Sequence, residues 1–197
     1  MGLDVAALVL PSAPGARFLF VLDGTLGVSA GQSDHVLVAD DFAFFPAGLP
    51  HTCGLRCIEQ DALRWAPDLA APPPRSVSSS VGATVLMYEQ RYVEPIGVAA
   101  SLLAQGIRPQ LQVGSTGSQP LLPVDGEVFG LRKLLPTTPE YDFNMHVMTF
   151  EPGEFLTVKE VHYNQHGLLL LEGQGIYRLA DKWCDTWRRL LWPPRPT

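Results

Sequence analysis

The chain contains 197 residues, of which 46% are hydrophobic and 17% are charged, and its formal net charge is −6. This length allows one large domain or two small ones, and the hydrophobic fraction is sufficient for a buried core. A weakly acidic chain without a basic stripe argues against nucleic acid as a partner, and no apolar run is long enough to span a bilayer. The 18 glycines and 18 prolines are typical of a turn-rich chain of many short strands.

The first half of the chain is predicted to consist of strands separated by an insertion. Residues 17–28 contain two apolar runs around an Asp-Gly pair, which predicts a hairpin. Residues 35–45 and 84–92 predict further strands. The segment 55–82 contains three consecutive prolines and a serine run, so we predict that it cannot form the interior of a sheet and is an insertion.

The second half is predicted to be richer in β-structure. An irregular region at 95–110, interpreted as a second insertion, includes a short helix predicted over residues 98–105. A connector with one short strand then leads into nearly continuous β-structure over 141–183, with Pro-Gly and Glu-Gly turns. The alternating pattern stops at the end of this stretch, so the tail 184–197 is expected to be irregular.

The two halves share a short stretch of similar sequence. Each contains a hydrophobic run followed by an acid-Gly turn, FVLDGTLGV in the first half and LLLLEGQGIYRL in the second. A repeated run of this kind predicts a tandem array of one β-barrel unit. We therefore predict an all-β chain with an N-terminal barrel over 1–110 and a C-terminal barrel over 111–197.

One strand of the second half carries residues suited to a metal ion. Glu160 and His162 are two residues apart and share a face of a strand, and His166 follows closely enough to converge with them. A carboxylate and two imidazoles suit Mn²⁺, Fe²⁺, Zn²⁺ or Ni²⁺. Burying these groups among the surrounding leucines is costly without a partner, and a metal ion would be such a partner. The three residues taken alone could instead be the polar face of an edge strand or a hydrogen-bonded core pair, but the flanking Pro-Gly and Glu-Gly turns favour the metal site.

The spacing of these residues resembles a known motif. The pattern G-x6-E-x-H-x3-H-x6-G, from Gly153 to Gly173, resembles the first cupin motif with its ligand types permuted. Glu160 stands at the first His position and His166 at the Glu position. The (S)-ureidoglycine aminohydrolases show this permutation, and residues 112–183 resemble their metal strand and its flanks. In the first half, PAGLPH resembles the second cupin motif.

The resemblance implies a bicupin, that is, two cupin barrels in tandem, of which only the second binds metal. The ion would be manganese, and the reaction would hydrolyse (S)-ureidoglycine to (S)-ureidoglycolate and ammonia in allantoin catabolism. Glu160, His162 and His166 match three of the family's metal ligands, and Tyr177 matches a tyrosine of the substrate pocket. Glu160 and Tyr177 are therefore the candidate catalytic residues. The resemblance also suggests the endoplasmic reticulum and allows a homo-oligomer.

The chain also departs from the family. The family's fourth ligand, a Gln, and a further Tyr and Lys follow the position of residue 183, and the tail lacks them. We therefore expect an incomplete C-terminal barrel and a weak enzyme. The alternative is a non-catalytic cupin that acts as a binding or structural protein. An iron-dependent cupin dioxygenase or isomerase is a third interpretation, which the permuted Glu-x-His disfavours.

The remaining candidate residues have plainer interpretations. His51 would be a ligand in a metal-binding cupin, but the first half has no His-x-His, so we predict a structural or vestigial role. Cys53 and Cys57 could be half of a zinc site, yet no second pair exists, and ordinary thiols are the better interpretation. Lys159 alternates away from Glu160 and is expected on the outer face.

Overall fold

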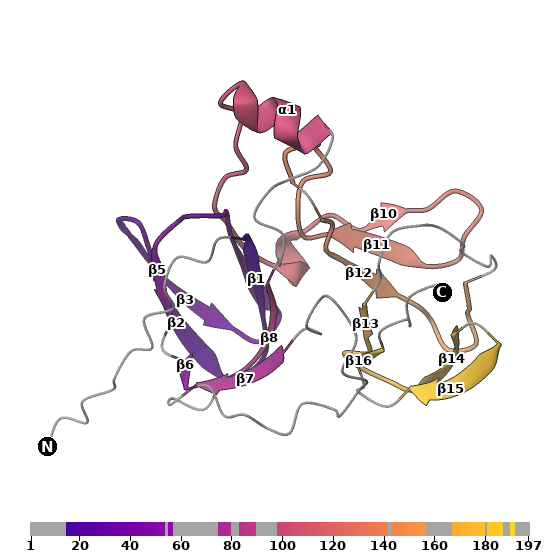
Figure 1. The fold of residues 1–197 in the computed structure, drawn as a ribbon. Coiled ribbons are helices and arrows are strands. Elements are labelled where there is room, and N and C mark those ends of the chain that lie inside the picture. The colour runs from indigo at the N-terminus through magenta and orange to yellow at the C-terminus, as the bar shows by residue number, and fades with distance from the viewer. Residues whose placement is uncertain are drawn as a thin grey trace, which may run out of the picture.

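The computed structural model describes residues 15–53, 55–56, 75–79, 83–89, 98–141, 143–156, 167–179, 181–186 and 190–191. This part of the chain is almost entirely β-structure (Figure 1). Its helical segments are the α-helix α1 (Val98–Ala104) and the 3₁₀ turn η1 (Thr116–Ser118). The predicted all-β class is therefore confirmed, as is the predicted short helix.

The largest sheet of the first half has six antiparallel strands. In spatial order these are β6 (Leu55–Arg56), β7 (Arg75–Ser79), β8 (Thr84–Glu89), β1 (Arg17–Asp23), β4 (Asp41–Phe45) and β9 (Gln112–Ser115). A second sheet has three antiparallel strands, β3 (Ser33–Val38), β2 (Thr25–Ala30) and β5 (His51–Cys53). The two sheets face each other and enclose a barrel-like interior (Figure 1).

Alternation along the strands explains this core. On β1, Leu19 and Val21 point into the interior, where they meet Leu26 and Val28 of the facing sheet. Aromatic residues at the intervening positions point to the opposite face of the sheet and belong to a second apolar cluster. Strands β1 and β4 are therefore buried on both faces, which accounts for their continuous apolar sequences.

Two predictions about the first half are wrong. The Asp-Gly pair does not close a hairpin, because β1 pairs with β4 and β8 whereas β2 pairs with β3 and β5. Gly24, with φ of 80°, instead makes a corner between the two sheets. The serine-rich β7 is not excluded from the sheet interior either, because it pairs with β6 on one side and β8 on the other.

The described strands of the second half form three small antiparallel sheets. The first sheet comprises β10 (Leu122–Pro123), β11 (Gly130–Lys133) and β12 (His146–Thr149). In the second sheet, β13 (Leu168–Leu169) pairs with β16 (Leu190–Leu191). In the third sheet, β14 (Gly175–Leu179) pairs with β15 (Lys182–Thr186).

These strands correct two further predictions. The connector contains three strands, β9, β10 and β11, rather than one. The β-structure also does not stop at the predicted tail, because β15 runs to Thr186 and β16 lies within 184–197. The cause is cross-strand pairing with β14 and β13, which the local sequence pattern does not reveal.

The two halves meet on the outer face of the large sheet. Phe18, Phe20, Phe42 and Phe44 of β1 and β4 form one cluster there with Leu134, Leu135 and residues from the 141–147 segment. Strand β9 begins just after the predicted boundary at residue 110, yet it is hydrogen-bonded to β4 of the first half. The division into two domains and the incompleteness of the second barrel stay predictions.

Among the described residues, no helix has the length and apolar character needed to cross a membrane.

Candidate functional site

The predicted metal ligands Glu160, His162 and His166 lie outside the described residues. Within the described part of the chain, no group of three or more His, Cys, Asp or Glu residues could hold a metal ion. Of the candidate residues near these ligands in the sequence, the structure describes the two motif glycines, Gly153 and Gly173, and Tyr177.

Tyr177 lies in the middle of β14, directly opposite Cys184 of β15. It is half-buried, whereas Ile176 beside it is 69% exposed. Because neighbouring residues of a strand point to opposite faces, Tyr177 is on the protected face of this hairpin. On the exposed face, the guanidinium of Arg178 lies 5.8 Å from the ring centre of Trp183. This placement is compatible with the pocket role predicted for Tyr177, which stays a prediction.

Two glycine turns bracket the predicted metal strand. Gly153 has φ of 90° and Gly173 has φ of 80°, both in the left-handed region that a side chain would strain. The predicted Pro-Gly and Glu-Gly turns are thereby confirmed. The glycines at the two ends of the cupin-like motif are thus required by backbone conformation.

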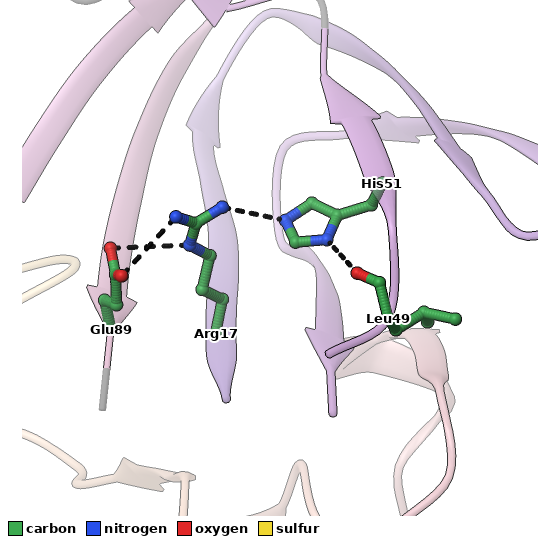
Figure 2. Close-up of polar contacts among 4 residues, drawn as sticks. All are labelled: Arg17, Leu49, His51 and Glu89. Atoms are coloured by element: carbon green, nitrogen blue, oxygen red, sulfur yellow. Dashed lines mark hydrogen bonds and ion pairs between the residues drawn. The ribbon is translucent and has the colours of Figure 1, made fainter. Parts of the chain in front are cut away.

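A buried polar cluster lies inside the N-terminal barrel (Figure 2). Arg17 of β1 lies between Glu89 of β8 and His51 of β5, so the cluster connects the two sheets. Nη1 of Arg17 donates a hydrogen bond to Nε2 of His51 at 3.3 Å, and Nη2 lies 3.4 Å from Oε1 of Glu89. Arg17 is 7% exposed and His51 is 4% exposed. A buried guanidinium is thus compensated by one carboxylate and one imidazole.

The hydrogen bonds of His51 define its tautomer. Nδ1 donates to the carbonyl oxygen of Leu49 at 2.9 Å, so Nε2 carries the lone pair that accepts from Arg17. The ring also stacks on Phe45, with 4.0 Å between ring centres. Burial lowers the pKa of His51 from its ordinary value of 6.5, and the nearby Arg17 charge acts in the same direction. His51 is therefore a neutral, fully engaged residue, in agreement with the structural role predicted for it.

Cys53 is part of the apolar interior of the same barrel. Its side chain is fully buried among apolar residues, and burial raises the pKa of its thiol to about 12. A thiol that stays protonated at neutral pH is a poor metal ligand. The structure therefore favours the ordinary-thiol interpretation of Cys53, while Cys57 lies outside the described residues.

The His51 cluster predicts a pH dependence of stability. Because the pKa of His51 is lower in the folded chain than in the unfolded chain, the unfolded chain binds the extra proton first as pH falls. The contribution of neutral His51 is complete above about pH 6.5 and is lost progressively below it. The unfolding free energy of the unchanged chain is expected to fall between about pH 7.5 and about pH 5, and His51→Gln should make this fall smaller.

Chemical denaturation at several pH values measures this difference. The unchanged chain, measured under the same conditions, is the reference for the variant. Glu89 and Arg17 also lie beside His51 and are present in both proteins, so the comparison is between histidine and glutamine at one position. Identical profiles for His51→Gln and the unchanged chain would contradict the assignment.

Sequence reasoning missed Arg17 and Glu89. Each lies at the end of an apolar strand, where a charged residue is ordinarily read as exposed. They are cross-strand neighbours in the register of β1 and β8, which places both side chains on the inner face. The sequence offered one weak signal, namely that Arg17 shares the period-two face of Leu19 and Val21.

Solved structures identify the fold of this chain. The protein Ylba from Escherichia coli matches with a TM-score of 0.64 and 22% identity, over 91% of this chain and 59% of that one. A putative glyoxylate-induced protein from Pseudomonas aeruginosa matches with a TM-score of 0.63 and 18% identity, over 91% of this chain and 57% of that one. Together with the facing sheets, these likenesses define a cupin-type β-barrel protein.

Curated relatives point to a particular group within that class. The chain is 44% identical over 181 residues to a probable (S)-ureidoglycine aminohydrolase of Oryza sativa subsp. japonica, which covers 91% of the chain and 48% of the relative. The (S)-ureidoglycine aminohydrolase of Arabidopsis thaliana gives the same identity over 91% of the chain and 50% of the relative.

An Escherichia coli (strain K12) protein of the same name is 29% identical over 116 residues, which covers 56% of the chain and 41% of the relative. No family model matches the chain. The resemblance to (S)-ureidoglycine aminohydrolases is confirmed, and the chain spans about half the length of the plant relatives it matches.

Proposed function

We propose that this chain acts as an (S)-ureidoglycine aminohydrolase. The observation that carries the proposal is the 44% identity to two plant proteins of that name over 91% of the chain. The reaction breaks the bond between the substrate's central carbon and its amino group and forms a carbon–oxygen bond with water. The products are (S)-ureidoglycolate and ammonia, so the partner is a small ureido carboxylate.

The residues proposed for the site have the chemistry that manganese requires. Glu160, His162 and His166 supply a carboxylate oxygen and two imidazole nitrogens, a donor set suited to a divalent first-row ion. Bound there, Mn²⁺ would supply Lewis acidity and a template for the substrate's carboxylate and amine. Leu168 and Leu169 of β13 follow this segment closely in the chain.

Tyr177 is proposed to orient the substrate. Its phenol can donate or accept a hydrogen bond, which suits the amide and carbonyl groups of a ureido acid. Its half-buried place on the protected face of β14 supports this assignment. Replacement by phenylalanine would preserve the packing of the ring and remove the hydroxyl group alone.

The proposal is tested by ammonia release from freshly generated ureidoglycine with Mn²⁺ present. We expect measurable release by the full chain, with the Arabidopsis relative assayed beside it as the reference. Glu160→Gln keeps the size of the side chain and removes its charge, and is expected to abolish release. A rate for the full chain equal to that of Glu160→Gln would contradict the proposal.

The alternative is a non-catalytic cupin that binds or supports another molecule. The names of the curated relatives favour the enzyme over this alternative. A homo-oligomer and a place in the endoplasmic reticulum, both implied by the family resemblance, stay predictions.

A further inference from the structure

A small groove lies over the β11–β12 ribbon, and its lining includes none of the predicted metal ligands. Its volume is about 230 Å³. It is lined by Leu131, Lys133, Leu135, Thr137, Asn144, Met145 and His146, which we call the β11–β12 groove. A second hollow of about 360 Å³ adjoins it and shares Lys133, Leu135 and Thr137 with it.

The groove carries basic groups and no acidic ones. Lys133 and His146 are directly opposite each other in the β11–β12 register. Cross-strand partners have Cβ atoms about 5 Å apart, so the ammonium group and the imidazole can reach the same ligand atom. None of the described lining residues of either hollow is an aspartate or a glutamate. This is notable in a chain with 20 acidic residues against 14 lysines and arginines.

The other lining residues combine an apolar base with polar groups. Leu135 is 3% exposed and belongs to the cluster that joins the two halves, so the base of the groove is fixed by packing. The N–H of Leu134 donates to the carbonyl oxygen of Met145 at 2.8 Å, which holds the two sides of the groove together beyond the strands. Asn144 and Thr137, both exposed, add an amide and a hydroxyl group.

We propose that the β11–β12 groove is an accessory binding site for a small carboxylate that also carries a ureido or amide group. Lys133 and His146 receive the carboxylate, because a cation opposite a second basic group is stabilised by an anion between them. Asn144 and Thr137 form hydrogen bonds with the ureido group. The choice of ureido acids rests on the proposed function, since its substrate and product belong to this class.

The probe is ureidoacetate, which is stable and has both groups, and its uncharged amide is the comparison ligand. Backbone amide shifts of the full chain are followed during titration. We expect shifts at residues 131–137 and 144–147, and about tenfold weaker binding by Lys133→Gln. Lys182→Gln removes the same charge from an exposed position on β15 and should bind as the unchanged chain does.

A second variant separates this site from the proposed metal site. His162→Gln/His166→Gln removes two of the proposed ligands and should leave the shifts at the β11–β12 groove in place. Loss of those shifts in this variant, equal binding of the uncharged amide, or unchanged affinity of Lys133→Gln would each overturn the proposal. If the chain binds ureidoacetate in the groove but releases no ammonia from ureidoglycine, the accessory site is supported. That result would contradict only the proposed function.

Discussion

We expect the His162→Ala variant to lose most of its bound Mn²⁺ and at least about a hundredfold of any manganese-dependent ammonia release. The alanine removes one of only two imidazole donors in the proposed set. Two remaining protein ligands would hold the ion weakly, and a poorly held ion cannot position the substrate. The measurement is the metal content of the purified full chain after dialysis, together with the rate of ammonia release.

The matched control for His162→Ala is Lys159→Ala on the same predicted strand. Lys159 is an odd number of positions from both Glu160 and His162, so strand alternation places it on the opposite face. We expect its metal content to equal that of the unchanged chain. Equal manganese in the His162→Ala variant and the control would show that His162 is no ligand, whatever the activity of the chain.

Strand identity was predictable from the sequence where apolar residues dominate. The run from Phe18 to Val21 is apolar because β1 is buried on both faces, and the sequence pattern therefore revealed the strand. The pairing of that strand was not predictable. Asp-Gly favours a hairpin locally, but β2 instead lies in the opposite sheet, where Leu26 and Val28 help to cover the inner face of β1.

The misjudged serine-rich and C-terminal segments have one physical cause. Ser76 and Ser78 give β7 little apolar signal, yet β7 fits between two strands that supply its backbone hydrogen bonds. In the tail, Cys184 pairs with Tyr177 and Asp185 with Ile176 across β14 and β15. Both strands are specified by distant partners more than by their own residues, and a local pattern cannot report such partners.

The candidate sites also differ in whether the local sequence reveals them. The spacing of Glu160, His162 and His166 is local, so the sequence alone predicts a metal site. The Arg17 cluster depends on contacts between residues that are 34 and 72 positions apart. The β11–β12 groove likewise needs the register of Lys133 and His146. Sites assembled by long-range pairing require the fold before they can be recognised.

The largest stability effect is expected at the junction between the two halves of the chain. Phe44 of β4 is 1% exposed on the outer face of the large sheet. Its ring centre lies 5.2 Å from that of Tyr141 and 5.7 Å from that of Phe143, so it joins the first sheet to the segment leading into β12. We expect Phe44→Ala to lower the unfolding free energy by about 3–5 kcal/mol, through lost burial and the cavity left behind.

Denaturant unfolding of the full chain gives this free energy, with Phe155→Ala as the control. Phe155 is 68% exposed, so its truncation should change stability by less than about 0.5 kcal/mol. Limited proteolysis adds a local readout, because loosening of this junction should expose the 136–144 loop to cleavage first. A Phe44→Ala chain as stable as the Phe155→Ala chain, with the loop equally protected, would show that the two halves are held together elsewhere.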